Sequence, residues 1–413
     1  MRVVIIGNGV AGITAARTLR KRSNWDIVVI SHEAPYHFAR PAMMYVSMGH
    51  LTFQNTKPYE DSFWRKNRIE LVHDEVVAVR SKGADTLGTY TVHCSSGYEV
   101  KADAVILATG SVESWYNWPG EHLRGVQAYI TKAHLDELEE NIRGVRNAVV
   151  VGGGLIGVEV AEVLHSRGLH VTMLVREPLF YGGVFPREEA TLLTKHITSR
   201  AINLRCNTEL RSIVPNTSAP ERVGGCILSN GTTAEAGVVV LATGVKPNTG
   251  LAEAVGLRTD RGIVVDEFFR TSLPNVYAIG DCAQLPHGVE QLWYTAKAHG
   301  ERIAHNLTGA ERPYQQGPYF NSAKFFDVEW QVYGNVPQSS NKHNSLLWQS
   351  ADENRLVRIC HVDGNVIGIH GLGVRLRQNV CEQWITNNTS LEDVQKNFTT
   401  ALFDAEFSPK VAL

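Results

Sequence analysis

The most informative residues for the fold are Arg2-Val3-Val4-Ile5-Ile6-Gly7-Asn8-Gly9-Val10-Ala11-Gly12. Its four consecutive β-branched residues are typical of a buried parallel strand. The glycines that follow have the Gly-x-Gly-x-x-Gly spacing, in which a strand turns tightly into a helix. Residues 11–22 continue with a helical pattern, and residues 27–30 form a second apolar run. The opening of the chain therefore predicts strand, turn, helix and strand, which is the start of a βαβ unit.

The same order of features occurs a second time. Gly152-Gly153-Gly154-Leu155-Ile156-Gly157 follows the apolar run 148–151, and a helical pattern at 156–167 and a run at 171–175 come next. Each half then ends on one tripeptide, Ala108-Thr109-Gly110 after residues 105–107 and Ala242-Thr243-Gly244 after residues 238–241. In such turns the second glycine lets the backbone approach a pyrophosphate. The sequence thus predicts an α/β chain of doubly wound sheets with two Rossmann-like dinucleotide-binding units.

Polar residues at the ends of three strands are candidate sugar-binding groups. Glu33 is the candidate for the adenosine ribose in the first unit, and a solvated glutamate is the alternative. In the second unit Arg176 suits the 2′-phosphate of NADPH, whereas Glu177 suits the 2′-hydroxyl of NADH; we favour NADPH as a usable donor. Gly280-Asp281 ends another apolar strand, so this carboxylate either accepts hydrogen bonds from ribityl hydroxyls or only caps a helix.

The composition excludes several classes of protein. The 413 residues include 40 basic and 42 acidic side chains, so the net charge of −2 provides no basic face for nucleic acid. No run approaches the roughly 20 apolar residues of a membrane span. The six cysteines are dispersed and the 16 histidines lack ligand spacing, so we expect neither disulfides nor a metal. Because a strand, and no secretion signal, opens the sequence, we expect a cytoplasmic protein.

The pattern changes after residue 313. Aromatic and β-branched runs at 329–333, 356–360 and 366–369 precede a helix-like tail at 390–403. These runs predict a separate, small α+β domain. We therefore expect three domains: residues 1–112 with 245–315, residues 113–244, and residues 316–413.

The order of the five motifs resembles that of the two-dinucleotide-binding flavoprotein oxidoreductases, the pyridine nucleotide-disulfide oxidoreductase superfamily. The resemblance covers essentially the whole chain. It implies FAD on the first unit, NADH or NADPH on the second, and insertion of the second unit into the first. It also implies a cofactor contact at Val77. In such an enzyme FAD takes a hydride from the nicotinamide and passes electrons to an acceptor.

Three shorter stretches are similar to the NAD(P)H–ferredoxin/rubredoxin reductase branch of that superfamily. Residues 36–41 end in Arg-Pro, like the branch's loop whose arginine reaches FAD, and this arginine is Arg40. Gly157-Val158-Glu159 resembles its Gly-x-Glu, which implies that Glu159 lies beside the flavin and the nicotinamide. Residues 293–300 resemble its helix that runs up to the flavin ring, which implies a place near the ring for Trp293. Glu159 and Trp293 are therefore the expected catalytic residues.

The chain also departs from that branch. The branch carries a lysine shortly after Arg-Pro that pairs with the glutamate near the flavin, and Tyr45 takes its place here. A lysine–glutamate pair is therefore not expected, and the sequence does not say what replaces it.

The resemblance narrows the range of possible electron acceptors. Disulfide reductases of the superfamily need cysteines next to the flavin, and residues 31–71 contain none. We expect a small iron–sulfur protein as acceptor, docked on a local basic patch for which Arg375 and Arg377 are candidates. The alternatives are an NADH oxidase or quinone reductase with small acceptors, and an NADH-sensing flavoprotein with little turnover. A monomer and a homodimer are both compatible with the sequence.

Overall fold

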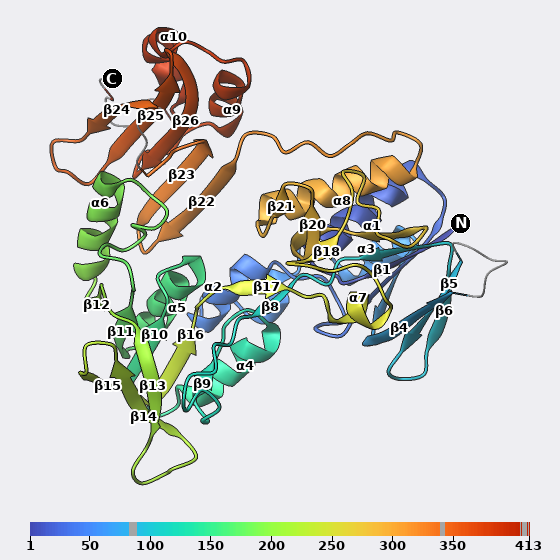
Figure 1. The fold of residues 1–413 in the computed structure, drawn as a ribbon, viewed down its shortest axis with the longest axis horizontal. Coiled ribbons are helices and arrows are strands. Elements are labelled where there is room, and N and C mark those ends of the chain that lie inside the picture. The colour runs from blue at the N-terminus through green and yellow to red at the C-terminus, as the bar shows by residue number, and fades with distance from the viewer. Residues whose placement is uncertain (82–88, 339–342, 405, 407–410, 412) are drawn as a thin grey trace. The chain divides into compact units, whose positions relative to one another are not determined.

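The computed structural model describes residues 1–81, 89–338 and 343–404, together with residues 406, 411 and 413 (Figure 1). The chain divides into two compact units. The first unit contains Met1–Ser114, Ile130–Asp136 and Gly244–Gln315, and the second contains Trp115–Tyr129, Glu137–Thr243 and Gln316–Leu413. The C-terminal residues thus group with the second glycine turn, and the boundaries of three separate domains stay a prediction.

The first unit is built on a five-stranded parallel sheet in the order β19-β7-β1-β2-β3. Its strands are the continuous apolar runs of the sequence, which suit strands that are covered on both faces. The helix α8 packs closely on α1, because a Cβ at Gly300 would lie 2.4 Å from the Ala11 carbonyl oxygen. These elements are β1 (Arg2–Ile6), α1 (Val10–Arg22), β2 (Asp26–Ser31), β3 (Ile69–His73), β7 (Ala104–Leu107), β19 (Val276–Ala278) and α8 (Trp293–Leu307).

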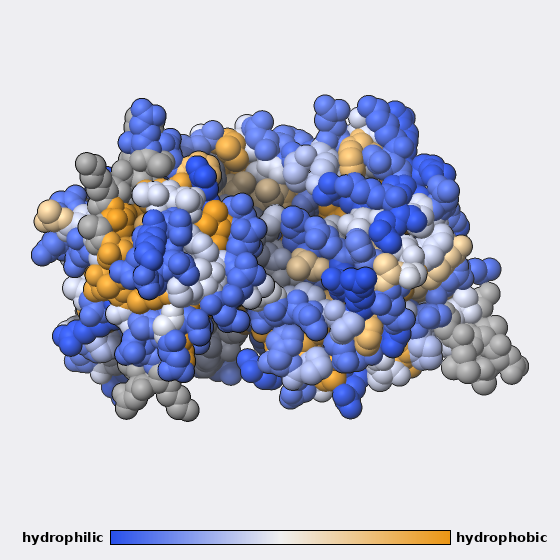
Figure 2. Space-filling model, turned by 90° about the horizontal axis from the view of Figure 1, so that it is seen from above, coloured by the Kyte–Doolittle hydropathy of each residue, from blue (hydrophilic) through white to orange (hydrophobic). Residues whose placement is uncertain are grey.

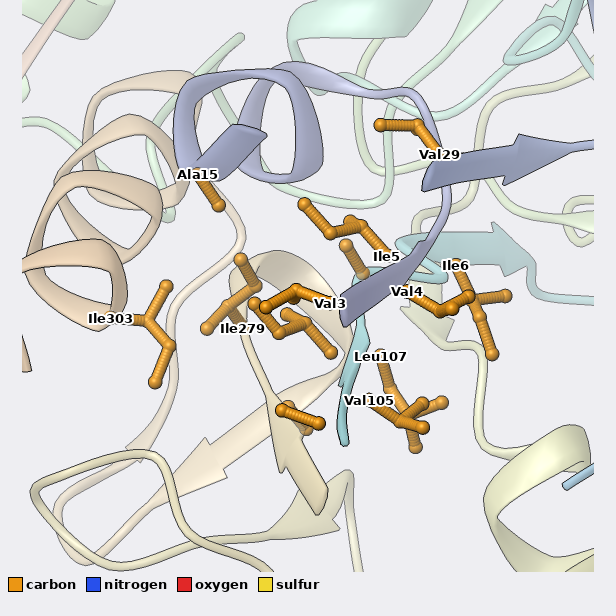
Figure 3. Close-up of a cluster of buried hydrophobic side chains, with 14 of the residues drawn as sticks. Val3, Val4, Ile5, Ile6, Ala15, Val29, Val105, Leu107, Ile279 and Ile303 are labelled. Carbon is orange, nitrogen blue, oxygen red and sulfur yellow. The ribbon is translucent and has the colours of Figure 1, made fainter. Parts of the chain in front are cut away.

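The core of the first unit contains side chains from both faces of this sheet, packed with those of the two helices and with others such as Val92 and Leu257. Figure 3 shows side chains of β1 and β7 together with Ala15 of α1 and Ile303 of α8. Val3, Val4 and Ile5 are fully buried. Burial of each such side chain stabilises the fold by about 1.5–3 kcal/mol relative to exposure. The glycine turn therefore follows a strand whose side chains are buried in the core of the unit.

Shorter elements complete the first unit. Two three-stranded sheets are formed by β4 with β5 and β6 and by β18 with β20 and β21, and β8 pairs with β17 in an antiparallel ribbon. The elements are the 3-10 helix η1 (Arg40–Ala42), α2 (Met43–Ser47), η2 (Phe53–Thr56), α3 (Asp61–Lys66), β4 (Val76–Ser81), β5 (Tyr90–Cys94), β6 (Glu99–Ala102), β8 (Ser111–Glu113), β17 (Val245–Pro247), α7 (Gly250–Ala254), β18 (Ile263–Val264), η4 (Gly280–Cys282), β20 (Ala283–Leu285) and β21 (Gly288–Val289). The helix α4 (Lys132–Asn141) begins in the first unit and ends in the second.

The second unit contains a similar parallel sheet, in the order β12-β11-β10-β16-β9. A smaller antiparallel sheet, β13-β14-β15, packs against it through a shared apolar cluster. The elements are β9 (Val126–Gln127), β10 (Asn147–Val151), α5 (Leu155–Ser166), β11 (His170–Leu174), α6 (Arg187–Thr198), β12 (Asn203–Arg205), β13 (Leu210–Pro215), β14 (Val223–Leu228), β15 (Thr233–Glu235) and β16 (Val238–Leu241). The predicted α/β class with two parallel Rossmann-like sheets is confirmed.

The C-terminal residues form an antiparallel sheet in the order β22-β23-β26-β25-β24, with two helices beside it. The helical pattern at 390–403 divides into α10 and a 3-10 turn. The elements are β22 (Phe320–Phe325), β23 (Val328–Gly334), β24 (Asn344–Gln349), β25 (Leu356–Val362), β26 (Asn365–Leu372), α9 (Gln378–Thr386), α10 (Leu391–Asn397) and η5 (Phe398–Ala401). Figure 2 shows a largely hydrophilic face on which hydrophobic residues gather in a few places.

A buried ion pair joins α6 to the C-terminal sheet within the second unit. The Arg358 guanidinium donates to both oxygens of Glu189 at 2.6 and 3.0 Å, and to Glu188 at 2.8 Å. Glu189 is fully buried, and its pKa falls to about 2: burial raises it, but the nearby His370 imidazole and the hydrogen bonds from Arg358 outweigh burial. Removal of one partner alone would leave a charge buried without compensation.

Candidate functional site

The first glycine turn is shaped by close backbone contacts. The Gly7 N–H donates to the Ile30 carbonyl at 2.8 Å. Gly7 has a φ of +114°, and a Cβ there would lie 2.1 Å from the carbonyl oxygen of Ala108. A Cβ at Gly12 would likewise lie 2.1 Å from the Gly7 carbonyl oxygen. Only glycine fits these two positions, and the turn is thereby pressed against the start of Ala108-Thr109-Gly110.

Gly9 differs from its two neighbours in the motif. Apart from its neighbours in the chain, none of the described residues has an atom within 4 Å of the place where its Cβ would stand. Gly9 caps α1 without any side-chain hydrogen bond, and the first turn of α1 contains no acidic residue. The first N–H groups of a helix have no acceptor within the helix and attract anions. The space at Gly9 and the adjacent N–H groups, including those of Val10 and Ala11, fit the pyrophosphate of a dinucleotide.

The second glycine turn repeats this geometry. The Gly152 N–H donates to the Leu174 carbonyl at 3.0 Å, and a Cβ at Gly152 would lie 2.3 Å from the Ala242 carbonyl oxygen. A Cβ at Gly157 would lie 2.2 Å from the Gly152 carbonyl oxygen. At Gly154, by contrast, no atom of the described residues beyond its chain neighbours lies within 4 Å of the Cβ position. The open position again precedes a helix, α5, whose first residues are Leu155 and Ile156. Each unit therefore carries one turn with room for a phosphate.

Glu33 and Arg40 form a pair beside the first turn. The guanidinium of Arg40 donates to the two carboxylate oxygens of Glu33 at 2.9 and 2.6 Å. Burial raises the pKa of Glu33, but the hydrogen bonds from Arg40 and the Lys132 N–H outweigh it, so the pKa is lowered. Arg40 also donates to the Ile130 carbonyl. The structure thus brings together two residues that the sequence singled out separately, and Glu33 is charged.

Asn8 is a member of the turn that sequence reasoning missed. Its buried amide donates to the Ala34 and Tyr36 carbonyls at 2.9 and 3.2 Å. The Asn8 carbonyl oxygen lies 2.7 Å from Nδ1 of His37, and burial lowers the pKa of His37 to about 4. The loop before Arg40 is therefore tied to the glycine turn by neutral groups. The asparagine between Gly7 and Gly9 was the only sequence signal.

Asp281 follows β19 in the 3-10 turn η4. Its carboxylate accepts a hydrogen bond of 3.1 Å from the Ser111 hydroxyl. Burial raises the pKa of Asp281, although the Ser111 hydrogen bond opposes the shift. Ser111 directly follows Thr109 and Gly110, and Thr109 donates to the Asn248 carbonyl at 2.7 Å. The ends of β7 and β19 thus lie side by side and place Asp281 next to the tripeptide.

Several of the predicted residues are exposed. Trp293 at the start of α8 is 46% exposed and meets Tyr294 edge to face at 5.4 Å. Val77, at a bulge in β4, is 51% exposed, and Tyr45 of α2 is 41% exposed. Gly244 has a φ of +105° and open space around its Cβ position. These residues offer accessible surface and not core packing.

Glu159 lies in α5 of the second unit. Burial raises its pKa to about 7, and the nearby Glu162 carboxylate adds to the shift. Among the described residues, no positively charged group opposes this shift. Its carboxyl group is therefore partly protonated near neutral pH.

Arg176 and Glu177 follow β11, where a dinucleotide ribose is expected. The Arg176 Nε donates to Glu177 at 2.8 Å, and the Arg176 side chain is 75% exposed. The two candidates for nucleotide recognition therefore form an ion pair with each other. By contrast, the candidate basic patch is partly neutralised: Arg375 lies 3.5 Å from Glu329 and over the ring of Phe403.

All six cysteines are free thiols, and all but Cys206 are buried. Burial raises the pKa of each of them, to about 11 for Cys94 and Cys360 and about 12 for Cys226. The thiolate is the reactive form of cysteine, and it is disfavoured at every position.

The described residues contain no cluster of three or more histidine, cysteine, aspartate or glutamate side chains that could hold a metal ion. Within the same residues, no helix is both long and apolar enough to cross a membrane.

Known proteins resemble the chain along most of its length. A probable ferredoxin reductase from Castellaniella defragrans is 30% identical over 81% of this chain and 81% of its own. An NADH oxidase from Methanocaldococcus jannaschii is 30% identical over 80% of this chain and 75% of its own. A nitrite reductase [NAD(P)H] from Bacillus subtilis is 27% identical over 85% of this chain, which spans only 43% of that enzyme.

The fold has solved counterparts. The ferredoxin reductase for the CYP199A2 system from Rhodopseudomonas palustris superposes with a TM-score of 0.80, at 25% identity, over 90% of this chain and 91% of that one. The family model of the pyridine nucleotide-disulphide oxidoreductases matches residues 1–300. The chain therefore belongs to the pyridine nucleotide-disulphide oxidoreductase family, and it is an oxidoreductase that uses FAD and NAD(P)H.

Proposed function

We propose that this enzyme transfers electrons from NAD(P)H, through FAD, to a small iron–sulfur protein of the ferredoxin or rubredoxin type. The observation that carries the proposal is that burial raises the pKa of all six thiols. Acceptors that contain a disulfide require a reactive cysteine in the reductase, and every cysteine here has a pKa raised by burial. The ferredoxin reductases among the relatives and solved structures support an iron–sulfur acceptor.

The chain's own residues have binding roles in this proposal. The turn at Gly7, Gly9 and Gly12 holds the FAD pyrophosphate, Glu33 and Arg40 bind its adenosine side together with Val77, and Asp281 accepts hydrogen bonds from ribityl hydroxyls. FAD, when bound, supplies the hydride acceptor for NAD(P)H and the electron donor for the carrier. Thr109 and Gly110 keep the end of β7 next to Asp281.

The second turn, at Gly152, Gly154 and Gly157, holds the NAD(P)H pyrophosphate. Arg176 binds the 2′-phosphate of NADPH once its ion pair with Glu177 opens. The Arg176 side chain is highly exposed and accessible to this phosphate, which favours NADPH as a usable donor. Glu159 holds a proton close to neutral pH, and Trp293 offers an exposed aromatic edge for contact with the acceptor.

Anaerobic rapid mixing tests this proposal. We expect NADH and NADPH each to bleach the visible absorption of the bound flavin, and added ferredoxin or rubredoxin to restore it quickly. Arg176→Ala should raise the KM for NADPH by about tenfold or more, since one charge-assisted contact is worth about 1.5–3 kcal/mol. The same variant should change the KM for NADH little. If neither carrier accelerates reoxidation beyond a buffer control, the proposed function is wrong.

A second candidate is an NADH oxidase, because an NADH oxidase is among the relatives at 30% identity. It predicts that oxygen alone sustains turnover as fast as any protein carrier. An oxygen electrode trace with and without ferredoxin separates the two candidates.

We also infer a reducing compartment, the cytoplasm, since six free cysteines without a disulfide are typical of proteins in such a compartment.

A further inference from the structure

A fully buried imidazole lies behind the Gly280–Asp281 turn in the first unit. His299 of α8 has no exposed surface. Its Nδ1 accepts a hydrogen bond of 3.1 Å from the Gly280 N–H, and its Nε2 lies 2.9 Å from the Glu290 carboxylate. Because a backbone N–H only donates, Nδ1 carries no proton. The proton is therefore on Nε2, which donates it to Glu290.

Glu290 is held by further donors. Its carboxylate accepts from the Tyr314 hydroxyl at 2.9 Å and lies 2.8 Å from Nε2 of His287. Burial raises the pKa of Glu290, but hydrogen bonds from His299 and its other neighbours outweigh burial and lower it. The imidazole packs against the rings of Phe269 and Tyr314, whose centroids are 4.8 and 4.7 Å from its own and 5.5 Å from each other. Glu290 and these rings therefore allow the imidazole one orientation.

The amide that His299 holds belongs to a turn with little freedom. Gly280 has a φ of +71°, and a Cβ there would lie 2.8 Å from the Cβ of Ala11. The turn thus packs against the first residues of α1, next to the glycine turn. A buried N–H without an acceptor is unfavourable, so loss of the imidazole would let the Gly280 turn shift to find another partner.

We propose that His299, oriented by Glu290, is a positioning residue for FAD: it fixes the Gly280 amide and thereby keeps Asp281 in place relative to the first glycine turn. The inference rests on the FAD-binding role proposed for Asp281. It does not depend on which acceptor the enzyme uses. A wild-type enzyme that binds FAD but reduces no iron–sulfur protein would refute the proposed function and leave this inference standing.

Three variants of the holoenzyme test it. His299→Phe keeps a ring and loses both hydrogen bonds. His299→Asn retains an acceptor near the Nδ1 position and loses the donor to Glu290. His305→Phe is the matched control, because His305 lies on the same helix α8 and its side chain has no hydrogen bond to any residue that the structure describes.

The readout is the release of FAD on dilution, followed by flavin fluorescence. We expect FAD to bind about 5- to 100-fold more weakly to His299→Phe, as for a buried amide left without its partner. His299→Asn should recover most of the affinity, and His305→Phe should stay within about twofold of wild type. Urea unfolding of the three apoproteins separates FAD affinity from stability. If His299→Phe lowers only the urea midpoint and retains wild-type FAD affinity, the imidazole merely supports the fold and the inference is wrong.

A spectrum of the wild-type holoenzyme provides a second test that needs no variant to fold. With ¹⁵N-labelled histidine, His299 should show a neutral ring with the proton on Nε2 and an unprotonated Nδ1. A signal for the Nδ1–H form, or for a doubly protonated ring, would contradict the hydrogen bond to Gly280 and overturn the inference.

Discussion

Alanine substitutions in the second glycine turn should separate folding from nucleotide binding. Gly154 has φ −86° and ψ −175°, which alanine adopts readily, and no atom lies within 4 Å of its Cβ position. Gly154→Ala should therefore leave the unfolding free energy unchanged or raise it by about 0.4–1 kcal/mol. At Gly157 a Cβ would lie 2.2 Å from the Gly152 carbonyl oxygen, so α5 must move. Such overpacking costs about 1–3 kcal/mol or more.

Gly154→Ala, which should not lower stability, should nevertheless weaken nucleotide binding. The methyl group of Gly154→Ala stands where the pyrophosphate approaches the helix, so NADP⁺ should bind at least about tenfold more weakly, a loss of about 1.4 kcal/mol. Calorimetric titration of the holoenzyme measures this loss, and urea unfolding measures stability. FAD content is the internal control, because the first turn is untouched. Wild-type NADP⁺ affinity in Gly154→Ala, or wild-type stability in Gly157→Ala, would refute the assignment of the two positions.

Three further predictions follow from buried groups. Because the pKa of Glu159 is raised from 4.5 to about 7, the folded chain should lose stability as the pH rises through that range. Glu159→Gln should remove this dependence and be more stable than wild type above pH 7, by about 1–3 kcal/mol in urea titrations at several pH values. At neutral pH a thiol reagent should modify the native enzyme slowly and without loss of reductase activity, whereas denaturant should release all six thiols. Arg358→Met should lower the unfolding free energy by about 3–5 kcal/mol, because it leaves the buried Glu189 charge without a partner. The double variant Arg358→Met with Glu189→Met should lose clearly less. Equal losses in the two variants would show that the buried charge of Glu189 is not the cause.

The parts of the fold that the sequence predicts are those determined by local spacing. The β-branched runs became the parallel strands, and the two fingerprints became turns in which a Cβ at Gly12 or Gly157 would meet a carbonyl oxygen. The short strands β20 and β21, between Gly280 and α8, were missed because two or three residues carry no readable period. The helix α8 begins at Trp293, at the start of the stretch 293–300 in which the resemblance implies a helix.

The supporting polar contacts could not be predicted, because they join residues that are distant in the chain. His299 meets Gly280 and Glu290, and no spacing rule relates the three. Glu33 was found as a candidate, but its pairing with Arg40 depends on how the intervening loop folds back. Asn8 occupies a position that the fingerprint leaves variable. A motif therefore indicates where a ligand binds, while the contacts that hold the motif in place follow only from the tertiary structure.

The strand order of the first sheet has a consequence for folding during synthesis on the ribosome. β19 pairs with β7 in that sheet, yet it is synthesised about 170 residues later. At about 5–20 residues per second, ribosomes need roughly 10–30 s for that interval. During this time the emerging sheet has an unpaired edge at β7, which invites association with other chains. A chaperone that covers this edge should raise the yield of enzyme, and the moment of greatest risk should end as residue 278 leaves the ribosome.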